Sequence, residues 1–408
     1  MRALKQHAPN LATILVAAFC AVWYCNSDFL RPSAGLRGPS DFHEFHRAAQ
    51  AILNGRSPYE NPAWFYPPLT AFLLAPFALT DYFTARWIWF ILSHVFLLSA
   101  AWIFWRGIGY GRIALCSIAI VWTFGGPARE SFVNGQIGAA LVLLLVLAFI
   151  QRSTRQGLAI GAGSALKYIP GILALALILN RSWRALAAFA VTIVIGIFIP
   201  WLVLLSFPGA KAPTRAHYWM GTPATFSWSI PSVVLRILEP PQPGGRLPYN
   251  WEFGNVAADL QLTRSHELIS AATAVFVLAA GIAALLLACH GRLDSAQMPW
   301  AMAGLISLSL AAAPVCWTHY QILQYPGVAW MLARTIERRA WMQAAFLLAC
   351  GVMLYQLPQA MLTTYYNAHA GWTAASLPTL YIWTSVTPVA CLGIFGLTLW
   401  KLIPLAPS

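Results

Sequence analysis

The chain has 408 residues, of which 59% are hydrophobic and 9% are charged, and its mean hydropathy is +0.64. A water-soluble domain carries roughly 25% charged residues, so these proportions exclude a soluble globular enzyme, a disordered chain and a disulfide scaffold. A helix that crosses a bilayer needs about 20 apolar residues. The composition therefore predicts an all-α, polytopic integral membrane protein, a single domain over residues 1–408 with about ten transmembrane helices.

The formal net charge is +13, from 25 Lys and Arg residues against 12 Asp and Glu residues. In a soluble protein this excess would favour a nucleic-acid partner. Here the basic residues stand singly or in pairs between apolar runs, which is how the orientation of a membrane protein is encoded. We therefore expect membrane lipids, and no nucleic acid, as partners. The seven cysteines lie in or beside apolar stretches, where they act as small core side chains.

Ten apolar runs are expected to cross the membrane. In chain order they cover residues 11–25, 82–105, 113–125, 137–151, 185–206, 267–290, 298–313, 320–333, 341–362 and 380–400. We interpret the first as an uncleaved span, because polar sequence begins directly after it.

Short basic linkers separate several of these runs. They contain Arg2, Lys5, Arg106, Arg112, Arg152, Arg155, Arg181, Arg184, Arg292, Arg334, Arg338, Arg339 and Lys401. By the positive-inside rule these 13 residues and both termini face the cytoplasm. Residues 157–180 are apolar with basic pairs at both ends, and Gly161, Gly163 and Pro170 interrupt them around Lys167. We expect a re-entrant helical hairpin here, two half-helices that enter and leave on the cytoplasmic side.

This topology leaves extracytoplasmic loops at residues 26–81, 126–136, 207–264, 314–319 and 363–379. Nine of the 12 acidic residues lie in them: Asp28, Asp41, Glu44, Glu60, Asp81, Glu130, Glu239, Glu252 and Asp259. Polar chemistry is therefore predicted on the extracytoplasmic face of a bacterial inner or plasma membrane.

The first loop contains an expected amphipathic helix over residues 41–54. Apolar side chains recur in it at helical spacing, and Asn54-Gly55 provides a stop signal. Asp41 opens this helix, and two interpretations of it stay open. It is only an N-cap that forms a capping box with Glu44, or it is a general base at the membrane surface.

The same helix carries His43, Glu44 and His46, a pattern that lacks the paired histidines four residues apart of zinc proteases. We therefore favour a solvated polar face and predict no metal site. Aromatic residues follow in Pro58-Tyr59 and Phe65-Tyr66-Pro67-Pro68, which lead into a short apolar helix. The loop over residues 207–264 is also rich in aromatic residues: His217, Tyr218, Trp219, Phe226, Trp228, Tyr249, Trp251 and Phe253. Such a set could stack on a sugar, line a lipid chain or form the core of the loop itself.

Further polar groups stand at the outward ends of expected spans. Arg129-Glu130 and Asn134-Gly135-Gln136 precede one span, and His319-Tyr320 begin another. Lys167 is interpreted as the only basic residue deep within an apolar run. Ionisable residues at membrane depth are functional candidates, whereas a lysine can also extend its stem toward the headgroups.

The order of these motifs resembles glycosyltransferase family 87, the polyprenyl-phosphate-mannose-dependent alpha-1,2-mannosyltransferases of the GT-C superfamily. The resemblance runs from Asp41 to Tyr320. It rests on Asp41 before an Ala-rich helix, Asn54-Gly55, Pro58-Tyr59, Phe65-Tyr66-Pro67-Pro68, Asn134-Gly135-Gln136, Lys167-Tyr168-x-Pro170 and Trp317-x-His319-Tyr320.

This resemblance implies an inverting membrane glycosyltransferase of the GT-C type. It would move a hexose, with mannose expected, from a polyprenyl-phosphate-sugar donor to a lipid or glycan acceptor on the extracytoplasmic face, without a cofactor. Asp41 matches the acidic base of the family, and His319 matches a position near the reactive phosphate. The other substrate-binding candidates are Lys167, Arg129, Glu44, Tyr59, Asn134, Gln136 and Tyr320.

The alternative function is a secondary transporter or a lipid flippase, suggested by the many spans and the broken segment around Lys167. Transporters place polar residues at mid-membrane on discontinuous helices. The nine acids in outer loops and the amphipathic helix instead favour an enzyme. A polymerase or ligase of lipid-linked glycans shares the donor class and stays open.

Overall fold

The computed structural model describes residues 11–30, 33, 36, 40–61, 64–109, 111–123, 125–207, 227–238, 264–356 and 377–403. Within these residues the fold is helical, which confirms the all-α prediction. The extended pairing that they contain is an isolated antiparallel bridge between Ser227 and Trp317.

Each of the ten expected spans contains helix. The elements are α2 (Leu11–Tyr24), α6 (Tyr82–Ile108), α7 (Gly111–Thr123), α9 (Gly138–Ile150), α12 (Trp183–Ile193) continued by η5 (Val194–Phe198) and α13 (Ile199–Leu205), α17 (Arg264–Ala288), α18 (Met298–Ala312), η6 (Thr318–Gln324) with α19 (Tyr325–Glu337), α20 (Trp341–Gly351) with η7 (Val352–Gln356), and α22 (Leu377–Leu402). In the described part of the chain, four segments are long and apolar enough to cross a bilayer: Tyr82–Ile108, Trp183–Leu205, Leu268–Ala288 and Ser385–Leu402.

Local sequence explains where the longest of these helices begins and ends. Asp81 Oδ1 accepts hydrogen bonds from the Phe83 and Thr84 backbone N–H groups at 3.0 and 3.1 Å, so it caps the first turn of α6. Gly109 has φ +76°, a left-handed conformation that ends the helix at little steric cost.

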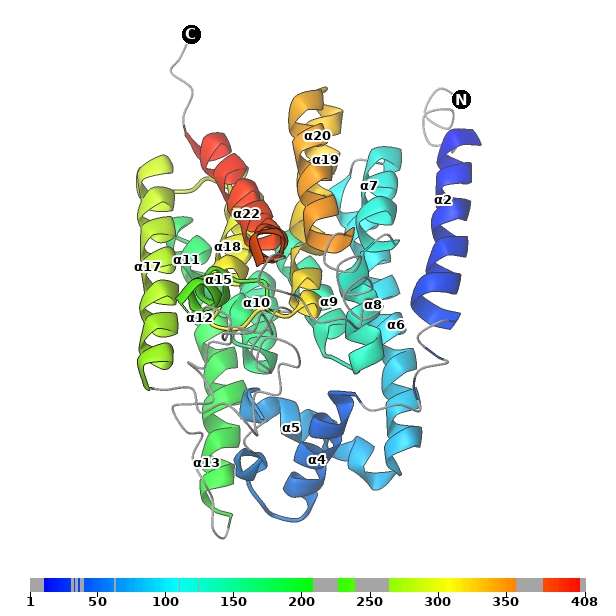
Figure 1. The fold of residues 1–408 in the computed structure, drawn as a ribbon, viewed down its shortest axis with the longest axis vertical. Helices are drawn as coiled ribbons and strands as arrows, with labels where there is room; N and C mark the ends of the chain where they lie inside the picture. The colour runs from blue at the N-terminus through cyan, green and yellow to red at the C-terminus, as the bar shows by residue number, and fades with distance from the viewer. Residues whose placement is uncertain are drawn as a thin grey trace.

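The helices form a bundle in which α2 begins and α22 ends at one end of the molecule, whereas α4 and α5 lie at the other (Figure 1). Contacts between helix ends place the basic linkers at the end where α2 begins and α22 ends. The C-terminal ends of α6 and α9 pack against each other. The Leu293 N–H, between α17 and α18, donates to the Leu179 carbonyl at 3.0 Å, and Gln297 Nε2 donates to the Leu402 carbonyl at 3.3 Å.

We call this the basic end. The described basic residues at its helix ends and turns are Arg106, Arg112, Arg152, Arg155, Arg181, Arg184, Arg292, Arg334, Arg338, Arg339 and Lys401. Linkers that are far apart in sequence thus lie on one side of the bundle, as the positive-inside rule predicts.

The expected hairpin consists of α10 (Thr154–Leu166), η4 (Ile169–Leu173) and α11 (Ala174–Leu179), with the break at Lys167. Its two arms start and finish at the basic end. The start of α10 packs on the start of α12, because a Cβ on Gly157 would lie 1.9 Å from the Ala185 carbonyl oxygen. Leu179, the last residue of α11, is bonded to the linker before α18.

The glycines of this segment have a different role from the one predicted. Gly161 and Gly163 do not interrupt the chain but lie inside α10. Gly157 faces Ala185, Gly161 faces Thr192, and Ala165 faces Gly196, so α10 and α12–η5 run parallel at close range. Small residues four apart let two helices approach this closely. The break comes from Pro170, which lacks the N–H that an α-helix would need.

The first-loop helix is α4 (Phe42–Leu53), followed by η2 (Pro58–Glu60), α5 (Pro68–Leu74) and η3 (Ala75–Leu79). Its apolar face is buried against protein. The Phe45 ring lies 5.6 Å from that of Trp64, and the Phe42 ring stacks on Trp89 of α6 at 6.4 Å. Aromatic contact and apolar burial therefore anchor the start of α4 on α6.

Candidate active site

The candidate site is centred on a contact between the first-loop helix and the segment before α9. Gln136 Nε2 donates a hydrogen bond to Asp41 Oδ2 at 2.7 Å. Gln136 is buried, so this bond fixes one carboxylate oxygen against a rigid neighbour. Asp41 makes no side-chain cap on α4, and its φ and ψ of −60° and −20° are helical rather than those of an N-cap.

This arrangement excludes one of the two interpretations of Asp41 left open by the sequence. The capping-box interpretation is wrong, because neither carboxylate closes back on the first turn of α4. Glu44 instead accepts a hydrogen bond from Asn61 Nδ2 and lies 4.0 Å from Arg47.

The Asn134-Gly135-Gln136 motif is the turn that delivers Gln136 to Asp41. Helix α8 (Gly126–Asn134) ends at Gly135, which has φ +66°, and the Gln136 N–H returns to the Ser131 carbonyl at 2.8 Å. This is the usual way in which a left-handed residue closes the C-terminus of a helix. A Cβ on Gly135 would also lie 2.6 Å from Phe42 Cβ, so a side chain here would push α4 and Asp41 away.

Tyr66 and Lys167 complete the cluster. The Tyr66 hydroxyl donates to Gln136 Oε1 at 2.6 Å, so Gln136 links the phenol to the carboxylate. Lys167 Nζ lies 3.3 Å from the centre of the Tyr320 ring and 5.1 Å from that of Tyr66. Such cation–π contacts hold an ammonium group at a defined place.

Lys167 reaches this place because it stands at the tip of the hairpin, in extended backbone with φ −155° after α10 ends. The chain is tied here to α5, since Thr70 Oγ1 donates to the Leu166 carbonyl at 2.8 Å. The lysine therefore points to the cluster and does not extend toward the basic end.

The surroundings of Asp41 change its acidity. The residue is exposed by its accessible surface, yet enough protein surrounds it for desolvation to raise the pKa of its carboxyl above the usual range. The hydrogen bond from Gln136 and the charge of Lys167 act in the opposite direction. A carboxylate of raised pKa that still reaches solvent is suited to accept a proton.

Comparison with known proteins identifies the family. The model of glycosyltransferase family 87 matches residues 64–314, more than half of the chain.

The chain belongs to glycosyltransferase family 87.

Two known proteins are similar to different shares of the sequence. The chain is 24% identical over 391 residues to the polyprenol-phosphate-mannose-dependent alpha-(1-2)-phosphatidylinositol mannoside mannosyltransferase of Mycobacterium tuberculosis (strain ATCC 25618 / H37Rv), covering 87% of this chain and 84% of that protein. It is 30% identical over 190 residues to the alpha-(1->3)-arabinofuranosyltransferase of Mycobacterium tuberculosis (strain CDC 1551 / Oshkosh). That match spans 44% of this chain and 43% of the relative, less than half its length.

Among solved structures, ArnT from Cupriavidus metallidurans bound to undecaprenyl phosphate aligns with a TM-score of 0.42 at 14% identity. The alignment covers 97% of this chain and 78% of ArnT. The family match and the apolar helices together make this chain a multi-pass membrane protein of a glycosyltransferase family.

Within this family 87 protein, the other candidate residues occupy different positions relative to the cluster. Tyr320 supplies the ring beneath Lys167 and so belongs to it. Tyr59 is buried, and its hydroxyl donates to the Tyr66 carbonyl at 2.9 Å. It therefore supports the loop that carries Tyr66. Glu44, one turn along α4 from Asp41, fastens α4 to Asn61 of the same loop.

Asn134 and Arg129 lie on α8, in a second group of ionisable residues. Asn134 Nδ2 donates to Glu130 Oε2 at 3.3 Å. The charge of Arg129 acts on Asp28 and Glu130, although no described carboxylate lies within 4 Å of it. Burial raises the pKa of Asp28 to about 8 and raises that of Glu130, while Arg129 lowers both.

His319 lies on η6, next to Tyr320 and close to the charge of Lys167. It is 6% exposed, and its ring meets that of Tyr320 edge-on at 4.7 Å. Nε2 is buried and has no hydrogen-bond partner among the described residues. A buried polar atom without a partner is uncommon and marks a place where a ligand can supply one.

Sequence reasoning missed two contributors. Tyr66 appeared only as one aromatic of a motif, although its hydroxyl bonds Gln136. Arg86 is 1% exposed in the first turns of α6, and its guanidinium donates to the Val133 carbonyl at 2.9 Å, beside the turn that carries Gln136. Lys167 is thus not the only basic residue within an apolar run, and the rule that such residues are functional candidates applied to Arg86 as well.

Of the aromatic residues named for the loop over residues 207–264, the structure describes Trp228. It is buried, and its indole N–H donates to Thr318 Oγ1 at 2.9 Å, next to His319. The other aromatic residues named for that loop lie outside the described residues. The rings of His43 and His46 both lie edge-on to that of Tyr82, at 5.7 and 5.9 Å, and His46 Nε2 lies 3.2 Å from the Thr80 carbonyl oxygen. The described residues contain no group of three metal-ligating side chains.

Proposed function

We propose that this protein transfers a hexose, with mannose favoured, from a polyprenyl-phosphate donor to a hydroxyl group of a lipid or glycan acceptor, with Asp41 as the general base. The observation that carries this proposal is the position of the Asp41 carboxylate. It is turned away from its own helix toward Gln136, in a cluster with Tyr66, Lys167 and Tyr320. Mannose is favoured because the relative that matches most of the chain is mannose-dependent.

The proposed chemistry needs one base. Asp41 takes the proton of the acceptor hydroxyl as its oxygen attacks the anomeric carbon of the donor. The bond from that carbon to the phosphate oxygen breaks, and its electron pair leaves with the polyprenyl phosphate. Attack opposite to the leaving phosphate inverts the configuration of the sugar. The proton on Asp41 is then released to solvent, which the carboxyl reaches.

The leaving phosphate gains negative charge and requires cations or donors around it. Lys167 is the first candidate. Its ammonium group lies over the Tyr320 ring, and its positive charge acts to lower the pKa of Asp41. His319 is the second, because Nε2 has no partner among the described side chains and carbonyls. Arg129 is the third candidate, because its charge acts on Asp28 and Glu130 but no described carboxylate lies within 4 Å of it.

We further propose that the site works on the extracytoplasmic side. The support is the separation between the cluster and the basic end. Gln136 precedes the first turn of α9 and Lys167 follows the last turn of α10, whereas the basic linkers lie at the opposite ends of both helices. Each helix has 13 residues, and at about 1.5 Å per residue this places the cluster roughly 20 Å from the basic end.

The test is the substitution Asp41→Asn. Asparagine keeps an oxygen that accepts the Gln136 hydrogen bond but cannot accept a proton at neutral pH. We expect normal membrane levels and normal donor binding, with transfer reduced by about 10² to 10⁴. The assay uses purified protein with radiolabelled polyprenyl-phosphate mannose, glucose and arabinose against extracted lipids and glycans.

Glu44→Gln is the matched control, because Glu44 is one turn along the same helix and is bonded to Asn61. It should retain transfer. An inactive Glu44→Gln beside an active Asp41→Asn would move the base by one helical turn. If both variants stay active, neither carboxylate is the base, and the result favours the transporter as the alternative function.

A further inference from the structure

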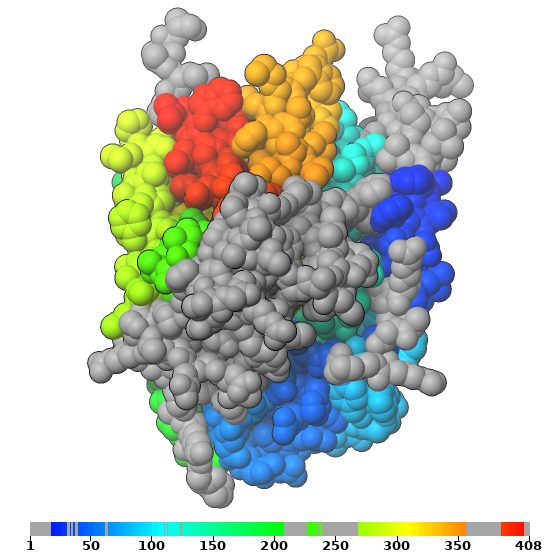
Figure 2. Space-filling model, viewed as in Figure 1, coloured from blue at the N-terminus to red at the C-terminus, as the bar shows by residue number. Residues whose placement is uncertain are grey.

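A groove separates α20 from α22 at the basic end, far from the candidate active site. Its volume is about 810 Å³, within the range of small-molecule pockets. Most of the wall is apolar and includes Trp341, Met342, Phe346, Leu397 and Trp400. Figure 2 shows the two helices side by side at the end of the molecule away from α4.

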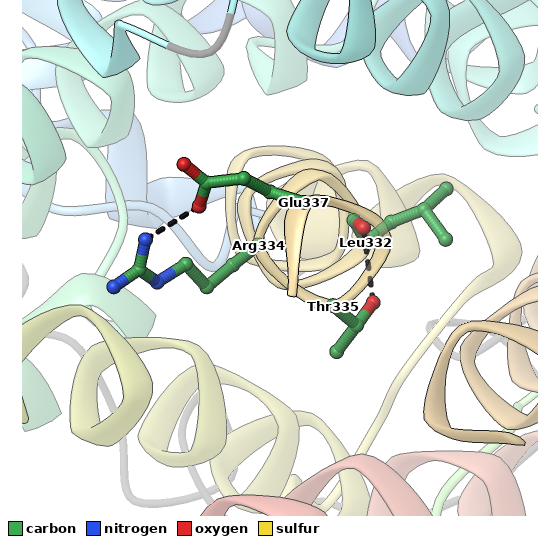
Figure 3. Close-up of polar contacts among 4 residues, drawn as sticks. All are labelled: Leu332, Arg334, Thr335 and Glu337. Carbon is green, nitrogen blue, oxygen red and sulfur yellow. Dashed lines mark hydrogen bonds and ion pairs between the residues drawn. The ribbon is translucent and has the colours of Figure 1, made fainter. Parts of the chain in front are cut away.

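The groove opens beside unneutralised positive charge. Arg339 lines it, and Arg338 precedes Arg339 in the turn after α19. The carboxylate nearest in sequence, Glu337, is bound by Arg334 at 2.5 Å (Figure 3). Among the described residues no carboxylate lies within 4 Å of Arg338 or Arg339.

A third cation, Lys401, lies near the other wall, where its Nζ is also 5.9 Å from the centre of the Trp300 ring of α18. Lys401 Nζ lies 5.0 Å from the centre of the Trp400 ring, and Trp400 lines the groove. Lys401 and Arg338 are close enough for their like charges to repel. Arg339 in the wall of the groove, with Arg338 next to it in the chain and Lys401 next to Trp400, favours an anionic group at this opening.

We propose that this groove binds one anionic phospholipid from the membrane leaflet at the basic end. Its acyl chain packs among the apolar residues of α20 and α22, and its phosphate lies between Arg338, Arg339 and Lys401. The tryptophans suit this place, since their rings prefer the level of the headgroups. The proposal goes beyond the transfer reaction and does not depend on it.

The choice of occupant follows from the two parts of the groove. An apolar wall alone accepts any acyl chain or detergent. Basic residues near a membrane surface each contribute about 1 kcal/mol to the binding of anionic lipid, whereas a headgroup without net charge gains no such attraction. The groove should therefore distinguish phosphatidylglycerol from phosphatidylcholine.

Binding is measured by native mass spectrometry of the full chain released from nanodiscs that contain phosphatidylglycerol, phosphatidylcholine or both. We expect one phosphatidylglycerol retained per protein, in preference to phosphatidylcholine. Arg339→Gln and Arg338→Gln should each weaken retention about five-fold, which is the change that 1 kcal/mol produces.

A groove-filling variant tests the apolar part. A Cβ on Gly396 would have no atom within 4 Å, so Gly396→Phe adds its ring to open space in the groove and should abolish retention without harming the fold. Arg152→Gln at the same end of the bundle, and Leu287→Phe on the exposed face of α17, are the matched controls and should retain the lipid.

Three results would overturn the proposal. These are the absence of retained lipid in the unaltered protein, equal retention of the two phospholipids, or loss in the controls as large as in the groove variants. The transfer assay with Asp41→Asn is independent, so failure of one proposal leaves the other standing.

Discussion

At the scale of single residues, the role of Asp41 depends on a partner 95 positions away. Its neighbours in sequence suggested a capping box with Glu44. In the structure the carboxylate accepts a hydrogen bond from Gln136 and makes no side-chain cap on α4. The same bond sets its acidity, together with burial and Lys167. Burial raises the pKa of this carboxyl, and the other two groups limit the rise.

The acidity of Asp41 gives a prediction for the pH dependence of transfer. If Asp41 is the base, as we propose, it works when deprotonated, so kcat/KM should fall as the pH drops through the pKa of Asp41 in the free enzyme. Because this pKa is raised, the acid limb should lie above the usual aspartate range near 4. Gln136→Met removes a hydrogen bond to the charged form and should move the acid limb to higher pH, as should Lys167→Met.

Gln156→Met is the control for this experiment, because Gln156 is also buried but donates to the Ala148 carbonyl at the basic end. Its acid limb should match that of the unaltered enzyme. If the acid limb of Gln136→Met matches that of the unaltered enzyme, Gln136 does not bond the titrating group, however much the rate falls.

At the scale of elements, the hairpin carries the lysine and the parallel packing of α10 on α12 holds the hairpin. The contact relies on Gly157, where the backbones of the two helices approach too closely for any side chain. The hairpin needs such a neighbour because both of its arms are short: α10 has 13 residues and α11 has six.

Gly157→Ala should therefore destabilise the protein. The added Cβ would lie 1.9 Å from the Ala185 carbonyl oxygen, and overpacking of this kind costs about 1–3 kcal/mol. We expect a lower Tm in detergent and reduced transfer, because the hairpin tip would move with α10.

Gly396→Ala is the matched control, since both glycines lie in helices and the Cβ on Gly396 meets nothing within 4 Å. Alanine has the higher helix propensity, so this variant should equal or exceed the unaltered protein in Tm. Equal Tm values for the two variants would contradict a tight α10–α12 contact.

At the scale of the whole molecule, the bundle separates two surfaces. One end gathers the basic linkers, and the other carries α4, α5 and the cluster around Asp41 (Figure 1). Because the same helices connect the two ends, the orientation of the protein in the membrane also decides which side of the membrane the site faces.

This separation predicts the outcome of thiol labelling in intact cells. Gln50 on α4 and Thr154 at the start of α10 are both exposed, at opposite ends of the bundle. In a background with exposed Cys25 changed to Ser, Gln50→Cys should react with a membrane-impermeant maleimide, and Thr154→Cys should react only after permeabilisation. Labelling of Thr154→Cys in intact cells would invert the topology and place the cluster on the cytoplasmic side.

The sequence alone determined the fold class, the approximate positions of the ten apolar helical segments and the family, but it placed α8 and α15 (Ile230–Leu238) in loops. Apolar runs and helix stop signals such as Asn54-Gly55 are local properties of the chain and were recovered in the structure, whereas the family match covers the motifs between residues 64 and 314. Tertiary structure decided the rest, because it depends on contacts between distant segments. Phe42 meets Gly135 only once α4 packs on α6, and only then does Gln136 reach Asp41. The glycines of α10 could not be distinguished from helix breaks in sequence, because their function is the absence of a side chain against a neighbour that only the folded bundle supplies.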